Sequence, residues 1–199
     1  VTALLTAAAD QYDDLRHRHI VRDPAIIGLM AYNGLRRAEV AGIRFEDFKK
    51  QDGDWAIRVR GKGNKQRLSP ITPALQRLLR PWVLLRLESF SDAEGQPVVF
   101  GKLTPEVRKA PLFIALDRWG NPIDENDARV AQGKSRTVGL VPSGIEAVVD
   151  DVVKRSGLVD SVTPHDLRRT FATKLMGLGF DLEEVQHAMG HADMRTTAR

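Results

Sequence analysis

Five residues in three separate segments of the chain combine strong hydrogen-bond donors with acid–base groups. They are Arg36, Lys62, His165, Arg168 and His191. Two arginine forks and a histidine can neutralise the non-bridging oxygens of a phosphoryl transition state. A lysine or histidine can protonate a leaving oxygen. No run of carboxylates suited to Mg²⁺ accompanies these residues in the sequence, so the set indicates phosphoryl transfer carried by side chains.

His165 and Arg168 lie three positions apart at the start of a predicted helix, so their side chains share one face. The opposite face carries an apolar stripe of Leu167, Phe171 and Leu175. A helix N-terminus favours an anion, which suits a phosphate beside these two side chains. The alternative is a solvated histidine and an arginine in a surface ion pair with Asp166.

The segment WAIRVRGKGNKQRLSPI alternates in polarity around a glycine-rich turn, which predicts a β-hairpin. Five basic residues fall within ten positions of it, with no acid among them: Arg58, Arg60, Lys62, Lys65 and Arg67. Such a hairpin fits a nucleic-acid groove or phosphate backbone, and the alternative is a solvated face. A nucleotide-binding P-loop is disfavoured, because Lys65 leads into Gln66 and Arg67 on a strand instead of opening a helix.

His187 and His191 are four positions apart, a spacing that can bind zinc. The zinc-protease pattern needs a glutamate beside the first histidine, and Ala188 stands there instead. Gly190 also ends the predicted helix between the two rings. We therefore expect no metal at this pair.

Composition narrows the class of protein. The 199 residues are 42% hydrophobic, which suits one compact domain. The net charge of +4 only leans towards a polyanionic partner. The absence of cysteine excludes disulfides, thiolate metal sites and cysteine nucleophiles. With no apolar run long enough to span a bilayer and no signal-peptide pattern at its start, the protein is expected to be soluble and cytoplasmic.

Helical periodicity dominates the first half of the chain outside the hairpin. We expect a helix capped by Asp23, with Pro24 in its first turn and Gly34 as its stop. RRAEVAGIRFEDF should form a second helix, and TPALQRLLRPWVLLRLESF a third that follows the hairpin.

Residues 91–142 are expected to hold loops or an insertion, with one short strand-like run at PLFIAL. Three further helices should follow, the first capped by Ser143 and the second by Thr163. The third should open with a capping box of Asp181 and Glu184 and end at Gly190. The fold class is therefore α+β, mainly α-helical, with a small antiparallel sheet in the N-terminal third.

Three segments together resemble the tyrosine recombinase, or phage integrase, family. They are NGLRRAEVAGIRFEDF, VRGKGNKQRLSPI and TPHDLRRTFATKLMGLGFDLEEVQHAMGHADMRTT, in the order that the family has them. The resemblance runs from about Leu4 to the last residue and is looser over residues 91–142. It implies the fold of the family's catalytic domain and site-specific DNA recombination or integration.

The resemblance also implies a role for each candidate residue. Arg36 and Arg168 would clamp the scissile phosphate, and Glu39 would support them. Lys62 would protonate the departing 5′ oxygen, His165 would assist the nucleophile, and His191 would bind the phosphate. The same comparison implies a 3′-phosphotyrosyl intermediate that stores the bond energy, so that no cofactor, metal or ATP is required.

The nucleophilic tyrosine is expected immediately after Arg199, following Thr196 and Thr197. Tyr12 and Tyr32 do not match its motif. We therefore expect residues 1–199 to be a catalytic-domain fragment that binds duplex DNA without cleaving it, lacking the family's N-terminal DNA-clamp domain and its C-terminal nucleophile segment. The resemblance implies a protein of bacterial, archaeal or phage origin that works with other recombinase protomers as a tetramer on DNA.

Three alternatives remain open at this point. A type IB topoisomerase uses a similar set of arginine, lysine, histidine and tyrosine. A DNA-binding module with relic catalytic residues is a second alternative, although it would have no need of the lysine and both histidines. In the third, another subunit supplies the tyrosine in trans.

Overall fold

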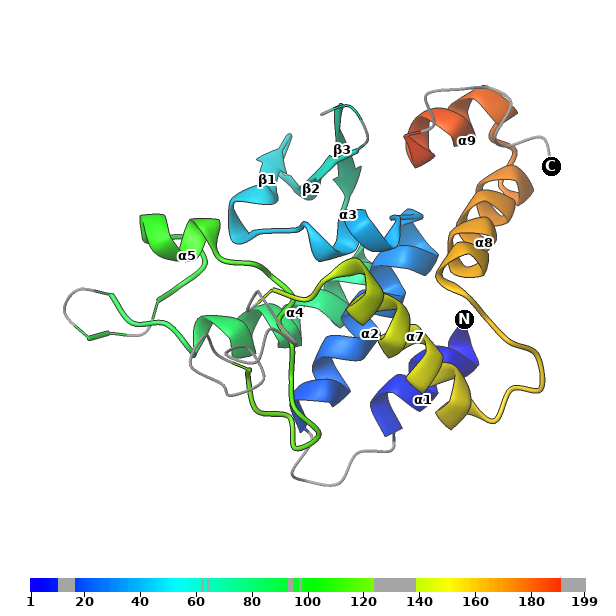
Figure 1. Cartoon of the computed structure of the whole chain (residues 1–199). Coiled ribbons are helices and arrows are strands. Elements are labelled where there is room, and N and C mark those ends of the chain that lie inside the picture. The colour runs from blue at the N-terminus through cyan, green and yellow to red at the C-terminus, as the bar shows by residue number, and fades with distance from the viewer. Residues whose placement is uncertain are drawn as a thin grey trace.

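The computed structural model describes residues 1–10, 17–61, 63, 65–92, 95–96, 98–123 and 139–190. Figure 1 shows the arrangement of the elements in these ranges. The helices are α1 (Thr2–Asp10), α2 (His17–Asn33), α3 (Arg37–Ala41), α4 (Pro73–Leu87), α5 (Pro105–Lys109), α7 (Pro142–Ser156), α8 (Pro164–Gly177) and α9 (Leu182–Met189). A short 3-10 helix, η2 (Phe45–Asp47), leads into the strands β1 (Phe48–Gln51), β2 (Asp54–Arg60) and β3 (Gln66–Pro70).

Helix α2 is the central element of the helical part and packs against α1, α4, α7 and α8. Its middle turns are apolar and buried, with Ala25, Ile26, Ile27, Leu29, Met30 and Ala31 each fully shielded from solvent. A helical segment that is apolar on every side is stable only in a protein interior, so the middle turns of α2 are expected in the core. Its C-terminal end therefore forms a fixed base for the segments that follow it.

The predicted start of this helix is wrong. α2 begins at His17, so Asp23 and Pro24 lie inside it. Asp23 is 1% exposed, and its carboxylate lies 2.8 Å from Nε of Arg22 and 3.8 Å from Nη2 of Arg155. The carboxylate therefore pairs with arginines in the interior, a role that local capping rules do not anticipate.

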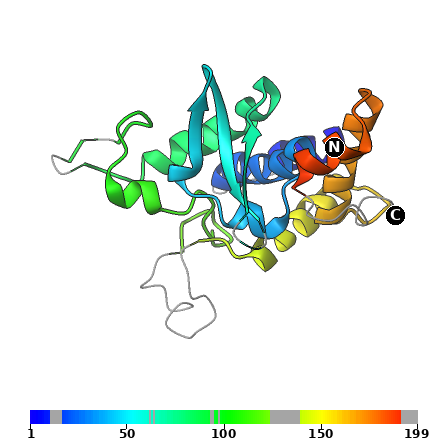
Figure 2. The same cartoon turned by 90° about the horizontal axis from the view of Figure 1, so that it is seen from above.

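The sheet has the order β1-β2-β3, with both pairs antiparallel. This confirms the predicted hairpin. The structure also contains β1, which was not predicted because its sequence, FKKQ, is short and mostly polar. Ile57 and Val59 are buried on one face, and Trp55, nearer the open end, is 37% exposed. Both views of the cartoon place the sheet between α5 on one side and α8 and α9 on the other (Figures 1 and 2).

The second predicted helix is much shorter than expected, because α3 ends at Ala41. Beyond Gly42 the backbone pairs with residues 110–112 instead of continuing the helix. The N–H of Phe45 donates to the carbonyl of Ala110, and that of Leu112 donates to the carbonyl of Ile43. Ile43 and Phe45 are 2% and 1% exposed, so burial of these side chains outweighs local helix propensity.

The described residues between 91 and 142 include the short helix α5, which was not predicted, and the last three helices are present as expected. PLFIAL forms isolated bridges at Pro111, Ile114 and Leu116 instead of a strand. Helix α7 is capped by Val141 with Pro142 in its first turn, so the predicted Ser143 cap is wrong. The Thr163 cap of α8, the capping box of α9 and the stop at Gly190 are confirmed.

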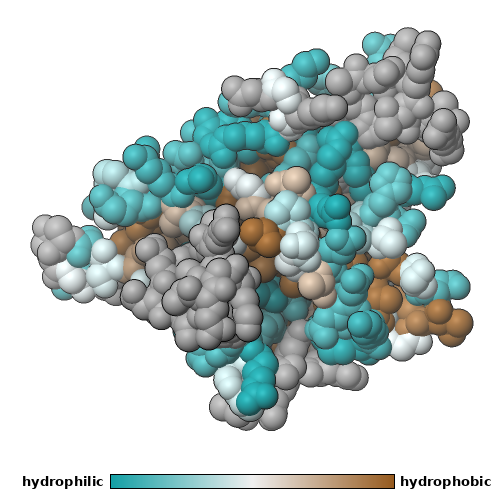
Figure 3. Space-filling view, in the orientation of Figure 1, coloured by the Kyte–Doolittle hydropathy of each residue, from teal (hydrophilic) through white to brown (hydrophobic). Residues whose placement is uncertain are grey.

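The surface is largely hydrophilic on the face shown in Figure 3, where hydrophobic residues form only small areas. Many large apolar side chains pack inside, whereas others, such as Trp119 and Leu178, are exposed. Trp82 is fully buried, donates its indole N–H to the carbonyl of Leu112 at 3.0 Å and stacks on Phe113. No helix in the described ranges has the length and hydrophobicity needed to cross a membrane.

The turn after α2 provides a test of how tightly the elements around it pack. Gly34 has a φ of +61°, and a Cβ at this position would overlap the ring of Phe171 on α8. Gly34→Ala should therefore combine backbone strain of roughly 1–2 kcal/mol with overpacking of roughly 1–3 kcal/mol. Gly157→Ala is a matched control, because its φ is +66° but nothing lies within 4 Å of the added Cβ. Urea denaturation should show a clearly larger loss of unfolding free energy for Gly34→Ala, and equal losses would contradict this packing.

Candidate active site

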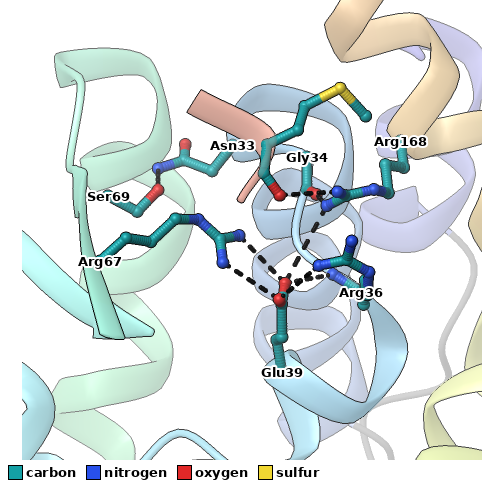
Figure 4. A network of polar contacts seen from close by, with 8 residues as sticks. Asn33, Gly34, Arg36, Glu39, Arg67, Ser69 and Arg168 are labelled. Atoms are coloured by element: carbon teal, nitrogen blue, oxygen red, sulfur yellow. Dashed lines mark hydrogen bonds and ion pairs between the residues drawn. The ribbon is translucent and has the colours of Figure 1, made fainter. Parts of the chain in front are cut away.

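Glu39 places a buried carboxylate where three arginines meet. It accepts hydrogen bonds from Nη1 and Nη2 of Arg67, each at 3.0 Å. It also accepts from the backbone N–H and from Nη1 of Arg36, at 2.8 and 2.9 Å. Nη1 of Arg168 lies 4.0 Å from the same carboxylate (Figure 4). The predicted contact between Arg36 and Glu39 is thus present, and one negative charge lies among three positive charges.

The local fold fixes Arg36 and Glu39 together. Gly34 turns the chain directly after α2, and Leu35 is fully buried behind the turn. Arg36 then takes the cap position of α3, and the carboxylate of Glu39 reaches back to its N–H. This return bond belongs to a helix capping box, so the first turn of α3 sets the position of both side chains.

Arg168 enters the cluster from α8 and is only 4% exposed. Its Nη1 donates to the carbonyl of Gly34, and its Nη2 donates to the carbonyl of Met189 at 2.6 Å. Burial, followed by the charges of Arg36 and Arg67, lowers the pKa of Arg168 to about 10, although Glu39 opposes the shift. The group is a cation at neutral pH, held between the C-terminal ends of α2 and α9.

The pKa of Glu39 lies below its ordinary value despite burial, which alone would raise it. Hydrogen bonds from the Arg67 side chain and the Arg36 backbone, together with the charges of both arginines, more than offset the burial. The carboxylate is therefore ionised at neutral pH and forms charge-assisted bonds with its partners.

An open cavity of about 1070 Å³ lies beside this cluster, and Arg36, His165 and Arg168 contribute to its lining. His165 is exposed in the first turn of α8. The structure thus brings these three predicted residues to one cavity. In the described part of the chain, no three His, Cys, Asp or Glu side chains form a group able to hold a metal ion.

Asp166 forms a capping box with Thr163 at the start of α8 instead of pairing with Arg168. Its Oδ2 accepts from the backbone N–H and the hydroxyl of Thr163, at 3.0 and 2.6 Å. These hydrogen bonds are the main reason that the pKa of Asp166 is lowered. The ion-pair alternative that the sequence left open for Arg168 therefore gives way to the contacts with Gly34, Met189 and Glu39.

Residues 1–199 match the phage integrase family over the whole chain. The chain belongs to the phage integrase family. It is 33% identical to tyrosine recombinase XerC of Corynebacterium glutamicum over 178 residues, which cover 89% of this chain and 45% of the relative. It is 31% identical to tyrosine recombinase XerC of Bifidobacterium longum over 195 residues, which cover 97% of this chain and 47% of the relative. The chain thus spans about half the length of the curated relatives it matches.

Solved structures agree with this assignment. A crystal structure of XerA recombinase is 27% identical and superposes with a TM-score of 0.67, covering 98% of this chain and 55% of that one. XerH recombinase bound to its difH substrate superposes with a TM-score of 0.65 at 20% identity, covering 98% of this chain and 47% of that one. The XerH likeness shows a shared fold only. Together these findings confirm the resemblance and the predicted fold class.

Two of the predicted catalytic residues of this phage integrase family member, Lys62 and His191, lie outside the described residues. The predicted DNA-binding residues of the hairpin are described. Lys65 is exposed, and its carbonyl accepts from the N–H of Gly61 at 2.8 Å, which closes the base of the hairpin loop. The predicted DNA-binding role of Lys65 stays a prediction.

Arg58 and Arg60 extend from β2 towards two acids of η2, which sequence reasoning did not connect with them. Asp47 is 1% exposed and accepts from Nε and Nη2 of Arg58, at 3.0 and 2.9 Å. Arg60 donates to Asp47 at 3.0 Å and to Glu46 at 3.1 Å. These two arginines therefore share their charge with acids of the protein, and their predicted DNA contacts stay predictions.

Sequence reasoning also missed that Arg67 belongs to the Glu39 cluster. The alternation of the strand places Arg67 on the hairpin, but no local pattern pairs it with an acid 28 positions earlier. Gly190 contacts the same guanidinium so closely that an added Cβ would lie 2.7 Å from Nη1. A glycine required by close packing, beyond its role as a helix stop, could not be distinguished from the sequence.

The lowered pKa of Glu39 predicts how the free energy of unfolding depends on pH. A carboxyl whose pKa is lower in the folded state than in the unfolded state stabilises the fold above about pH 4.5. This contribution is lost as the pH falls through the pKa of the folded state. Glu39→Gln should therefore be less stable than the wild type at pH 7, and the difference should shrink below pH 4.5. Denaturant unfolding between pH 7 and pH 3 measures it, with Glu183→Gln on the exposed surface of α9 as the control for the amide change. A difference that stays constant with pH would contradict this role of the carboxylate.

Proposed function

We propose that the chain is the catalytic domain of a site-specific DNA recombinase or integrase, which cleaves and rejoins strands through a 3′-phosphotyrosyl intermediate. The observation that carries the proposal is the convergence of Arg36, Arg168 and His165 on one cavity, with Glu39 holding the first arginine in place. Two cations beside one cavity suit a phosphodiester, whose charge increases on the non-bridging oxygens during displacement.

In this mechanism the tyrosine oxygen forms a bond to phosphorus as the bond from phosphorus to the 5′ oxygen breaks. His165 assists removal of the tyrosine proton, and Lys62 gives a proton to the departing 5′ oxygen. Arg36, Arg168 and His191 bind the phosphate oxygens throughout. Attack by a 5′-hydroxyl reverses these steps and returns the protons, so the phosphotyrosyl bond conserves the energy needed for rejoining.

The fixed position of Arg168 supports its role as a phosphate clamp. Two backbone carbonyls hold its guanidinium before any substrate arrives. A donor set in place beforehand needs little reorganisation at the moment of reaction, which is the main source of electrostatic catalysis. Arg36 has a 41% exposed side chain, so it is accessible from the cavity.

The nucleophile belongs to the segment that follows Arg199 in the parent reading frame, as the resemblance implies. The proposed partners are duplex DNA and further protomers in a tetrameric synaptic complex. XerH recombinase bound to difH and the Tn1549 integrase bound to transposon end DNA share this fold and support DNA as the partner. Residues 1–199 alone are expected to bind DNA weakly and to leave it uncleaved.

The first test uses a protein extended beyond Arg199 and a nicked suicide substrate that traps the covalent intermediate. Denaturing gels should show a protein–DNA adduct that depends on the tyrosine. Arg36→Ala and Arg168→Ala should each slow adduct formation by roughly 10²–10³-fold, the effect of losing one transition-state donor. Arg108→Ala, at an exposed position of α5, is the control and should keep the wild-type rate. An extended protein with no adduct, or an adduct indifferent to Arg168→Ala, would rule out the proposed enzyme.

The second test concerns the exposed Lys65 at the base of the hairpin loop. If Lys65 contacts a DNA phosphate, Lys65→Ala should weaken binding and reduce the slope of log affinity against log salt by roughly one. Fluorescence anisotropy across a salt series measures the slope, and Arg108→Ala again serves as the control. An unchanged slope would remove Lys65 from the DNA interface.

A further inference from the structure

The guanidinium of Arg67 forms hydrogen bonds within the protein. Both of its Nη atoms donate to Glu39 in a parallel, two-bond pair, each bond at 3.0 Å. The side chains of Arg67 and Glu39 are 16% and 3% exposed. Nε of Arg67 is buried and has no hydrogen-bond partner in the described part of the chain. This geometry directs the guanidinium inwards, towards α3 (Figure 4).

The close approach of Gly190 covers the same guanidinium from another side. An added Cβ at Gly190 would lie 2.7 Å from Nη1 and 3.0 Å from Cζ of Arg67. The C-terminal end of α9 therefore packs against Arg67, which also contacts α3 through Glu39. A side chain enclosed in this way is poorly placed to reach a DNA phosphate.

The three arginines around Glu39 differ in how strongly they bind its carboxylate. Arg67 gives the carboxylate two bonds, whereas the guanidinium of Arg36 gives one. Nη1 of Arg168 lies 4.0 Å from the Glu39 carboxylate, and the guanidinium donates its hydrogen bonds to two backbone carbonyls. Arg67 and Glu39 thus form the neutral pair, and Arg36 and Arg168 remain as surplus cations beside the cavity.

We propose that Arg67 is a positioning residue that neutralises Glu39, so that Arg36 and Arg168 keep their positive charge for the scissile phosphate. This inference rests on the proposed recombinase function. It replaces the direct DNA contact expected for Arg67 from its place on a basic hairpin. Without Arg67, the carboxylate would attract Arg36 and Arg168 and compete with the phosphate for both guanidinium groups.

A double-mutant cycle tests this directly, using the extended protein and single-turnover cleavage at saturating DNA. Arg67→Met keeps the volume and removes the charge, and it should slow cleavage by on the order of 100-fold. Glu39→Gln removes the competing charge, and its own loss should be roughly 10-fold because Arg36 loses its holder. The double variant should cleave about as fast as Glu39→Gln alone, since Arg67 then has no charge left to neutralise. Losses that multiply in the double variant would overturn the inference.

A second readout separates this role from a general loss of folding. A methylphosphonate at the scissile position removes the negative charge that the arginine clamp must neutralise. The defect of Arg67→Met should therefore shrink from about 100-fold to within a few-fold of the wild type on this substrate. Arg67→Lys retains the charge and should cleave phosphate DNA faster than Arg67→Met. An equal Arg67→Met defect on both substrates would indicate a structural role only and would overturn the inference.

DNA binding completes the test, with Arg108→Met as the matched control. In the Glu39→Gln background, where no carboxylate competes for Arg36 and Arg168, Arg67→Met should leave the dependence of affinity on salt unchanged. Loss of a direct phosphate contact from Arg67 would instead reduce the slope by roughly one and overturn the inference. Failure of the proposed function itself looks different, because the wild-type extended protein would then form no adduct at all.

Discussion

The buried carboxylate of Glu39 is the interaction on which the arrangement of the site depends. An ionised group away from water is tolerated only where opposite charges and hydrogen bonds replace the lost hydration. Here the replacements come from α3, β3 and α8, three elements far apart in the sequence. The requirement to satisfy one carboxylate therefore constrains how these elements assemble. Removing a partner would leave a buried charge uncompensated, and this is a larger penalty than the net stabilisation of the intact cluster.

The helical core makes this arrangement possible because it fixes the end of α2. Gly34 stops that helix in a conformation that lets α8 approach, and its buried carbonyl accepts a hydrogen bond from Arg168. Asn33 at the same helix end donates to Ser69 and to the carbonyl of Pro70 on β3, each at 2.7 Å. The last turn of α2 thus joins the hairpin to α8. The apolar packing of α2 thereby fixes the positions of polar side chains on the hairpin and on α8.

Sequence patterns predicted what depends on neighbouring residues and missed what depends on distant ones. The alternation of residues 54–70 and the caps of α8 and α9 reflect interactions within a few positions, and the structure has them. The contact of Arg36 with Glu39 was predictable for the same reason, as they are one helical turn apart. By contrast, the roles of Asp23, Asp47 and Arg67 depend on partners brought together only by the complete fold. Their residue types were visible in the sequence, but their use as buried counter-ions was not.

A common principle connects the two sets of arginines on the hairpin. Asp47, 1% exposed in η2, binds Arg58 and Arg60 of β2, and Glu39 of α3 binds Arg67 of β3. Both acids come from residues 36–47, so this segment holds the two long strands of the hairpin through buried charges. Acids within the protein therefore offset the positive charge of Arg58, Arg60 and Arg67, whereas Lys65 is exposed at the loop end of the hairpin. These buried ion pairs fix the direction of the hairpin relative to the arginine cluster around Glu39.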